Sequence, residues 1–169
     1  MVRKVWCGVL VLILGTFLPG AKICGASDPE RFNAVLEQTT VTFGNSVDEV
    51  IRRMGPPQKE DVRPDVSPHD PSSHFEWVHL TYPDLQLTLF RAPDKEFLVQ
   101  VDTRRSEDVF GKALRLGSLR KDVVRELGEP VEMRDQAMIY QDEAGYSELG
   151  FFLDPQGRVE RMTLDIMLD

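Results

Sequence analysis

Two stretches of the chain, residues 43–57 and 116–130, carry the same pattern at an offset of 73 residues and without a gap. Five aligned positions are identical, and five more hold residues of similar character. The identical pairs are Gly44 and Gly117, Val50 and Val123, Arg52 and Arg125, Gly55 and Gly128, and Pro57 and Pro130. A chain that carries one pattern twice is expected to build the same local structure twice.

Each copy has the features of a short capped helix. Ser46, with Glu49 three residues later, predicts a capping box in the first copy, and Ser118 is the expected N-cap of the second. Gly55 and Gly128 mark the helix ends, since glycine is favoured just after a helix. Apolar stripes at helical spacing lie between: Val47, Val50, Ile51 and Met54 in the first copy, and Val123, Val124 and Leu127 in the second.

After each helix the hydrophobic period changes from 3.6 to 2, which indicates strands. The expected strands are residues 75–81, 85–90 and 97–101 in the first copy, and 137–141, 148–153 and 158–166 in the second. Residues 58–73 hold several prolines together with acids and serines, and they predict an exposed loop. Asp28 and Pro29 favour one further helix, ending near Gln38, before the first copy.

The expected fold class is therefore α+β, a tandem repeat of one helix followed by a three-stranded antiparallel meander. The chain divides into a signal peptide (1–26), an N-terminal helix (27–42), repeat 1 (43–102), a linker (103–115) and repeat 2 (116–169). The leucine face of residues 85–89 and its counterpart at 149–153 need the helices to cover them. One such unit has a thin core, so we expect the two to join their sheets or to pack side by side.

The first residues have the pattern of an export signal. Arg3 and Lys4 precede a 14-residue apolar run at 5–18, which is too short to span a bilayer comfortably. Cleavage fits after Ala21 or after Ala26, and Ala26 is favoured. A third alternative is a lipoprotein whose mature chain begins at an acylated Cys24, the one arrangement that would attach this protein to a membrane. The expected location is the periplasm or the periplasmic face of an outer membrane.

The charge of the chain limits its partners. The full chain has a formal charge of −8, and loss of Arg3, Lys4 and Lys22 with the signal would make it −11. Such an acidic chain lacks the excess of basic side chains that nucleic-acid binding needs. Both cysteines, Cys7 and Cys24, leave with a signal cut after Ala26, so we expect neither a disulfide framework nor a thiolate metal site.

The repeated pattern resembles the SmpA/OmlA (BamE-like) domains of outer-membrane assembly lipoproteins, and two units in tandem resemble the two-layer sandwich of the β-lactamase-inhibitor protein. The matching residues are Gly117, Ser118, Asp122, Val123, Leu127, Gly128, Pro130 and Tyr140 in the second copy, and Gly44, Asn45, Glu49, Val50, Met54, Gly55, Pro57 and Trp77 in the first. The resemblance implies the fold and the habit of binding proteins. The inhibitor family carries disulfides that this mature chain would lack, and the lipoproteins carry a better lipidation signal and usually one copy.

Catalytic chemistry finds little support in the sequence. The serines lack a glycine-flanked elbow, no glycine loop opens a helix to hold phosphate, and the acids of the predicted turns are ordinary turn residues. We expect no enzyme and no cofactor. His74 and Glu76 share one strand face, and with His69 or Asp70 they form an alternative metal site, whereas His79 points to the other face.

Aromatic side chains on a sheet face without helices would be natural anchors for a protein partner. The candidate residues are Trp77, His79, Phe90, Tyr140 and Phe152. The alternative is that Trp77 and Tyr140 point inward and fill the core. The sequence thus predicts an exported, non-catalytic protein-protein interaction module of the bacterial cell envelope, with an envelope protein as partner. Alternatives are an accessory lipoprotein of outer-membrane assembly, a periplasmic metal- or small-molecule-binding protein, and a chaperone for exported chains.

Overall fold

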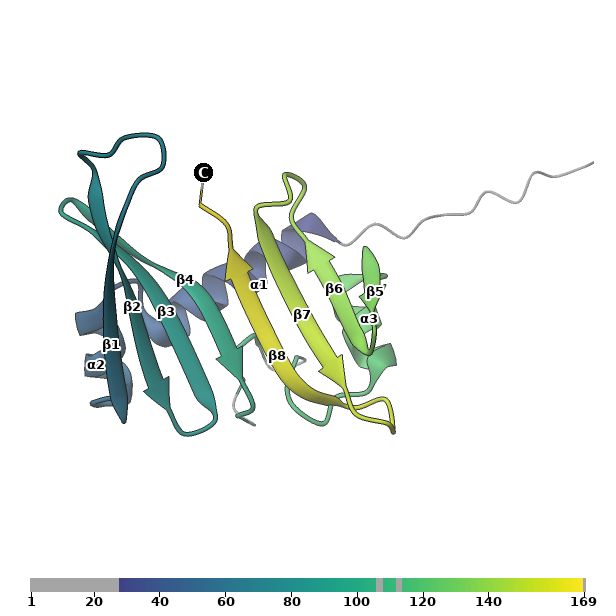
Figure 1. The fold of residues 1–169 in the computed structure, drawn as a ribbon. Coiled ribbons are helices and arrows are strands. Elements are labelled where there is room, and N and C mark those ends of the chain that lie inside the picture. Colours follow the sequence, from purple (N-terminus) through teal and green to yellow (C-terminus); the bar gives the residue numbers. More distant parts are fainter. Residues whose placement is uncertain (1–27, 106–107, 112–113, 169) are drawn as a thin grey trace, which may run out of the picture.

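A computed structural model describes residues 28–105, 108–111 and 114–168 (Figure 1). In these residues the chain forms one eight-stranded antiparallel sheet with three helices behind it. The helices are α1 (Pro29–Phe43), α2 (Val47–Met54) and α3 (Arg120–Leu127). The strands are β1 (Lys59–Val66), β2 (His74–Tyr82), β3 (Leu85–Ala92), β4 (Lys95–Thr103), β5 (Glu132–Arg134), β6 (Ala137–Gln141), β7 (Ser147–Leu153) and β8 (Val159–Ile166).

The strand order across the sheet is β1-β2-β3-β4-β8-β7-β6-β5. Each half of the chain therefore makes a four-stranded meander, and the last strands of the two halves meet in the middle. The junction is short, because β4 and β8 pair only from Gln100 opposite Asp165 to Thr103 opposite Met162. The part of β4 that precedes Gln100 is not paired with β8, and here the two strands separate.

The expected fold class, a tandem of one helix and a three-stranded meander in a two-layer sandwich, is wrong. The six expected strands are present, but β1 lies within the stretch expected to be a loop, β5 is additional, and all eight strands form a single open sheet. Both missed strands lie at sheet edges and have almost wholly exposed side chains, so neither shows apolar alternation. Pro64 in β1 is compatible with an edge position, where a proline need not donate to a second neighbour.

The helix starts and ends follow from local capping. Ser46 is the N-cap of α2 and its hydroxyl accepts from the Glu49 amide at 3.2 Å, while the Glu49 carboxylate accepts from the Asn45 amide at 2.9 Å. In α3 the N-cap is Leu119 rather than the expected Ser118, and Asp122 accepts from the Leu119 amide. Helix α1 begins after the expected N-cap Asp28 but continues to Phe43, beyond the expected end.

The hydrophobic core lies between the helices and one face of the sheet. The leucines of β3 and the alternating apolar residues of β7 are buried there, as expected, against apolar side chains of all three helices. The connection between β4 and α3, expected to be a charged linker, adds Val109, Phe110 and Leu114 to this core. The ring of Phe110 meets that of Phe151 edge-on at 6.4 Å.

Helix α1 runs behind both halves of the sheet (Figure 1). At its start, the Asp28 amide donates to the Leu127 carbonyl at 3.0 Å, and Arg31 donates to the carbonyls of Arg125 and Glu126 at the end of α3. Near its end, Arg53 of α2 donates to the Thr40 carbonyl at 3.0 Å. The helix thus joins the two halves on the side opposite the open face.

A candidate protein-binding face

Among the residues that the structure describes, none of the helices covers the sheet face opposite α1, α2 and α3, and we call it the uncovered face. Side chains alternate along a strand, so the residues between the buried leucines of β3 point to this face. In β2 the same rule places Trp77 and His79 here, and in β3 it places Thr88 and Phe90. Phe90, Ile139 and Ala137 are buried by neighbouring side chains although they are outside the helix-side core.

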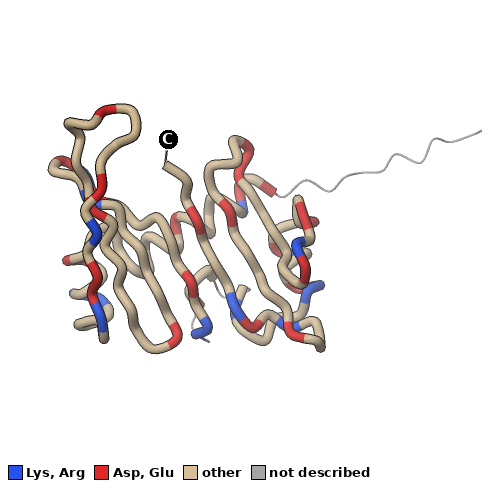
Figure 2. The backbone as a smooth tube through the Cα atoms, viewed as in Figure 1, with Lys and Arg blue, Asp and Glu red and all other residues tan. Residues whose placement is uncertain are grey.

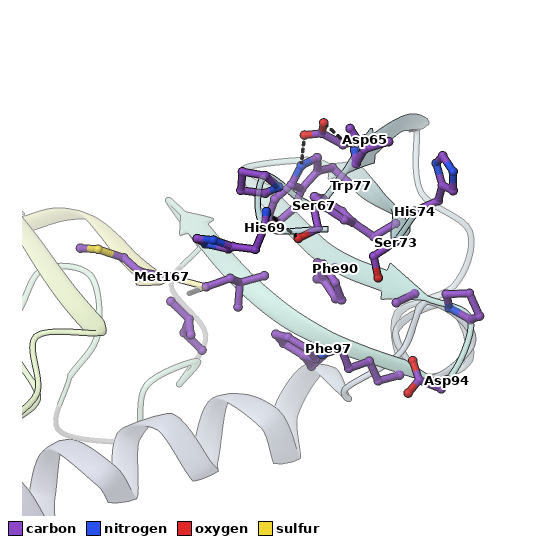
Figure 3. Close-up of a pocket in the computed structure, with 18 residues that line it drawn as sticks. Asp65, Ser67, His69, Ser73, His74, Trp77, Phe90, Asp94, Phe97 and Met167 are labelled. Carbon is purple, nitrogen blue, oxygen red and sulfur yellow. Dashed lines mark hydrogen bonds between the residues drawn. The ribbon is translucent and has the colours of Figure 1, made fainter. Parts of the chain in front are cut away.

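One end of this face holds an aromatic hollow, which we define by Phe75, Trp77, Phe90 and Phe97 (Figure 3). The cavity has a volume of about 970 Å³ and is also bounded by the β1–β2 turn and by the chain end at Ile166, Met167 and Leu168. Met167 is 55% exposed and Leu168 is 37% exposed, so apolar surface continues beyond the rings. The hollow lies where β4 and β8 are no longer paired, between the start of β4 and the end of β8.

The four rings pack on one another and hold the hollow in shape. Phe90 is central, with ring centroids at 4.9 Å from Phe75, 5.8 Å from Trp77 and 5.1 Å from Phe97. Phe75 and Trp77 meet edge-on at 5.4 Å. The Trp77 indole Nε1 donates to the Asp65 carboxylate at 3.3 Å, which fixes the indole from the edge strand (Figure 3). Such a cluster is preorganised for an apolar side chain.

A row of polar side chains crosses the middle of the face. Nδ1 of His79 lies 3.0 Å from the Thr88 hydroxyl, which donates to the Gln100 amide oxygen at 3.1 Å. The Gln100 amide nitrogen donates to the Asp165 carboxylate at 2.6 Å. Because the single Thr88 hydrogen is used on Gln100, Nδ1 of His79 must carry the proton that Thr88 accepts. The row therefore fixes the side chains of four adjacent strands.

Acidic side chains gather where this row reaches the second half of the sheet, and we call Asp102, Glu148 and Asp165 the acidic cluster. Glu148 and Asp165 are directly opposite each other on β7 and β8. Burial raises the pKa of the Asp165 carboxyl above its ordinary value, and the charges of Glu148 and Asp102 add to the rise. Figure 2 shows acidic and basic positions together on these central strands.

Two arginines partly neutralise the acidic cluster. Arg161 makes a two-point ion pair with Asp102. Arg134 lies 3.0 Å from Glu132 and 3.3 Å from Glu148. Asp165 accepts from the neutral amide of Gln100, and no cation of the described chain lies within ion-pair distance of it.

The structure places the five predicted partner-binding residues differently from one another. Trp77, His79 and Phe90 lie on the uncovered face, as does Phe152, whose ring is covered by the Arg161 guanidinium at 4.5 Å. Tyr140 instead points into the core, where it is fully buried and its hydroxyl donates to the Gly128 carbonyl at 3.0 Å. Burial raises its pKa well above the ordinary value. Tyr140 therefore offers no surface to a partner.

Sequence reasoning missed Phe75 and Phe97. Phe75 is two residues before Trp77 in the same strand, so the alternation that placed Trp77 also places Phe75. Phe97 is directly opposite Phe90 in the β3–β4 pair, a relation that needs the strand register. The first residue was within reach of the sequence, and the second was not.

The residues of the alternative metal site are not brought together. Glu76 is engaged by Arg91, with Oε2 at 2.7 Å from Nη2, and His74 is exposed at the start of β2. His69 in the β1–β2 turn and His74 at the start of β2 point in different directions (Figure 3). Asp70 is held by the backbone and side chain of Ser72. Within the described ranges, no group of three potential ligands could hold a metal ion.

The expected export signal and the expected lipidation site lie at the start of the chain. Cys24 and the export signal at 1–26 lie outside the described residues. Among the helices that the structure does describe, none is both long and apolar enough to cross a membrane.

Comparisons with known proteins give little similarity. No family model matches the chain, and no curated protein matches it. A solved structure, that of a DUF4309 family protein (YjgB) from Bacillus subtilis, is similar over 79% of this chain and 96% of that chain. The sequence identity is 12% and the TM-score is 0.39, which is too low to assign a shared fold.

Proposed function

We propose that this protein is an exported, non-catalytic protein-protein interaction module of the bacterial cell envelope that binds its partner on the uncovered sheet face. The observation that carries the proposal is the aromatic hollow, in which four mutually packed rings line a cavity of about 970 Å³ that none of the described helices covers. Large aromatic side chains held rigid in a partly desolvated depression are typical anchors of protein interfaces.

The position of the hollow supports a macromolecular partner. It lies at the rim of an open sheet, between a turn and a chain end, and its apolar border continues through Met167 and Leu168. Exposed contiguous apolar surface of this kind marks interaction sites in soluble proteins. The export part of the proposal rests on the basic start and the apolar run of residues 3–18.

A pull-down from the native envelope fraction tests the proposal. The bait is the protein purified after expression of the full chain, compared with its Trp77→Ala/Phe97→Ala variant. Val41→Ala is the matched control, because Val41 is an apolar residue that is 63% exposed on α1, outside the uncovered sheet face. We expect a stoichiometric envelope protein that is retained by the wild type and by Val41→Ala but lost by the double variant. Equal retention by all three baits would contradict the proposal.

The accessory-lipoprotein alternative depends on Cys24 alone. The intact mass of the natively expressed protein tests it, because an acylated Cys24 adds the mass of its lipid chains, and a chain that begins at Ser27 excludes acylation.

A further inference from the structure

The aromatic hollow and the acidic cluster are neighbours on the same strands. Phe97 of the hollow and Gln100 of the polar row are three residues apart on β4, and the irregularity in the β3–β4 pairing between them brings both to the uncovered face. Gln100 in turn donates to Asp165 of the acidic cluster. Three residues of a strand span about 10 Å. A short segment of a partner that fills the hollow therefore reaches the acidic cluster within a few of its own residues.

The second depression on the face has a volume of about 570 Å³ and an unequal set of charges in its lining. Its acids are Asp102, Asp135, Glu148, Glu160 and Asp165, against the two arginines Arg134 and Arg161. Both arginines are already engaged by Asp102, Glu132 and Glu148. The depression thus has an excess of negative charge. Among the described residues, Asp135, Glu160 and Asp165 form no ion pair in this lining, and of these three acids only Asp165 is half-buried rather than exposed.

The surroundings of Asp165 make it the most receptive of these acids. It is half-buried, is fixed by Gln100 and faces Glu148 directly across the strand pair. Like charges in such a position repel one another, and burial penalises each of them. A cation supplied from outside relieves both costs, whereas an anion or a bare apolar group relieves neither.

We propose, on the basis of the proposed function, that the partner inserts an apolar side chain into the aromatic hollow and, roughly three to five residues away along an extended segment, places a Lys or Arg against Asp165 and Glu148. The hollow supplies most of the affinity by burial. The acidic cluster selects for the cation and orients the segment along β4 and β8.

A random peptide library displayed on phage provides the probe. Selection is carried out on the wild-type protein, and the affinity of an enriched peptide, made synthetically, is then measured for wild type and for Asp165→Asn, Phe97→Ala and Asp48→Asn. Asp48→Asn is the matched control, since Asp48 is an exposed acid of α2, outside the uncovered face. Thermal unfolding of each variant verifies that it is folded, and Glu148→Gln serves as a second charge variant.

We expect the enriched peptides to combine an apolar residue with a Lys or Arg. Their affinity should fall about tenfold for Asp165→Asn and for Phe97→Ala, and remain unchanged for Asp48→Asn. Replacing the basic residue of the peptide by Gln should remove the difference between wild type and Asp165→Asn.

The outcomes separate the two proposals. The cationic partner is overturned if the enriched peptides lack a basic residue, or if they bind wild type, Asp165→Asn and Glu148→Gln with equal affinity. The proposed function still stands in that case if Phe97→Ala weakens binding. Peptides whose affinity Phe97→Ala does not change overturn the use of the hollow and with it the proposed function. A selection that yields no peptide with measurable affinity overturns the inference of a short segment and leaves the envelope pull-down to decide the function.

Discussion

Asp102 and Arg161 form a two-point ion pair next to the junction of β4 and β8, with Nε to Oδ1 at 2.9 Å and Nη2 to Oδ2 at 2.7 Å. The junction has few paired residues, so this contact is one of the limited connections between the two halves of the sheet. The side chains of Arg161 and Asp102 are 31% and 24% exposed, which places the pair between a surface ion pair and a buried one.

Asp102→Asn should lower the free energy of unfolding by about 1–2 kcal/mol, because it breaks a charge-assisted pair that is largely shielded from water. The measurement is urea unfolding followed by circular dichroism. Asp61→Asn is the control, since it removes an exposed ion pair with Arg63 and should change stability little. If the two variants lose the same free energy of unfolding, the pair at the junction stabilises the protein no more than an exposed ion pair does.

Asp165→Asn should change how stability depends on pH. The Asp165 pKa is raised in the folded protein, first by burial and then by Glu148 and Asp102, against the Gln100 hydrogen bond and the charge of Arg161. An acid with a raised pKa in the folded state binds its proton more tightly there than in the unfolded state. The folded protein therefore loses stability as the pH rises from the unfolded-state pKa of the acid, about 4, through its folded-state pKa. The variant should lack this loss and be the more stable protein above that window.

Thermal unfolding of wild type and Asp165→Asn over a series of pH values gives the difference curve. Only the difference is diagnostic, because Glu49, Asp61 and Asp70 have lowered pKa values and act in the opposite direction in both proteins. A difference that stays constant with pH would show that Asp165 titrates normally in the folded protein.

Tyr82→Phe and Tyr140→Phe should have similar effects. Each hydroxyl donates at 3.0 Å to the carbonyl of the glycine that ends a helix, Gly55 for Tyr82 and Gly128 for Tyr140. Loss of one such hydrogen bond costs about 1 kcal/mol. Chemical unfolding of the two variants should give comparable losses, and a much smaller loss in one of them would mean that the two contacts are not equivalent.

Gly150→Ala should be destabilising because its neighbour fills the space that a side chain needs. A Cβ at this position would lie 2.6 Å from the Thr163 hydroxyl and 3.2 Å from the Phe152 ring. We expect a loss of about 1–3 kcal/mol in the wild-type background. In a Thr163→Ala background the nearest contact disappears, so the same change should cost much less, and unfolding of all four proteins of this cycle provides the measurement.

The parts of the fold that the sequence predicts are those with a local signal. The cap of α2 at Ser46 and the alternation of β3 and β7 follow from residues close in the chain. The edge strands β1 and β5 give no such signal, because their side chains are exposed on both faces. The joining of the two meanders depends on pairs such as Val101 with Leu164, which no local pattern specifies.

The candidate site shows the same division. Alternation within β2 correctly groups Trp77 with His79, but it cannot say which strand face the helices cover. For this reason the sequence leaves both orientations of Tyr140 open, and the structure shows the inward one, with the hydroxyl donating to the Gly128 carbonyl. The link from Gln100 to Asp165 joins residues 65 positions apart and needs the strand order itself.

Helix α1 has a consequence for the order in which the molecule can be completed. Its first residues are the earliest of the described chain to be synthesised, yet Arg31 finds its acceptor on α3 at a separation of 94 residues. Strands β1 to β4 pair with immediate neighbours and can form early, whereas the start of α1 can be covered only after α3 and the second meander have been made. Closure of the core is therefore a late, long-range step, and a chain interrupted before α3 would expose the start of α1, including the apolar Phe32, to solvent and so favour aggregation.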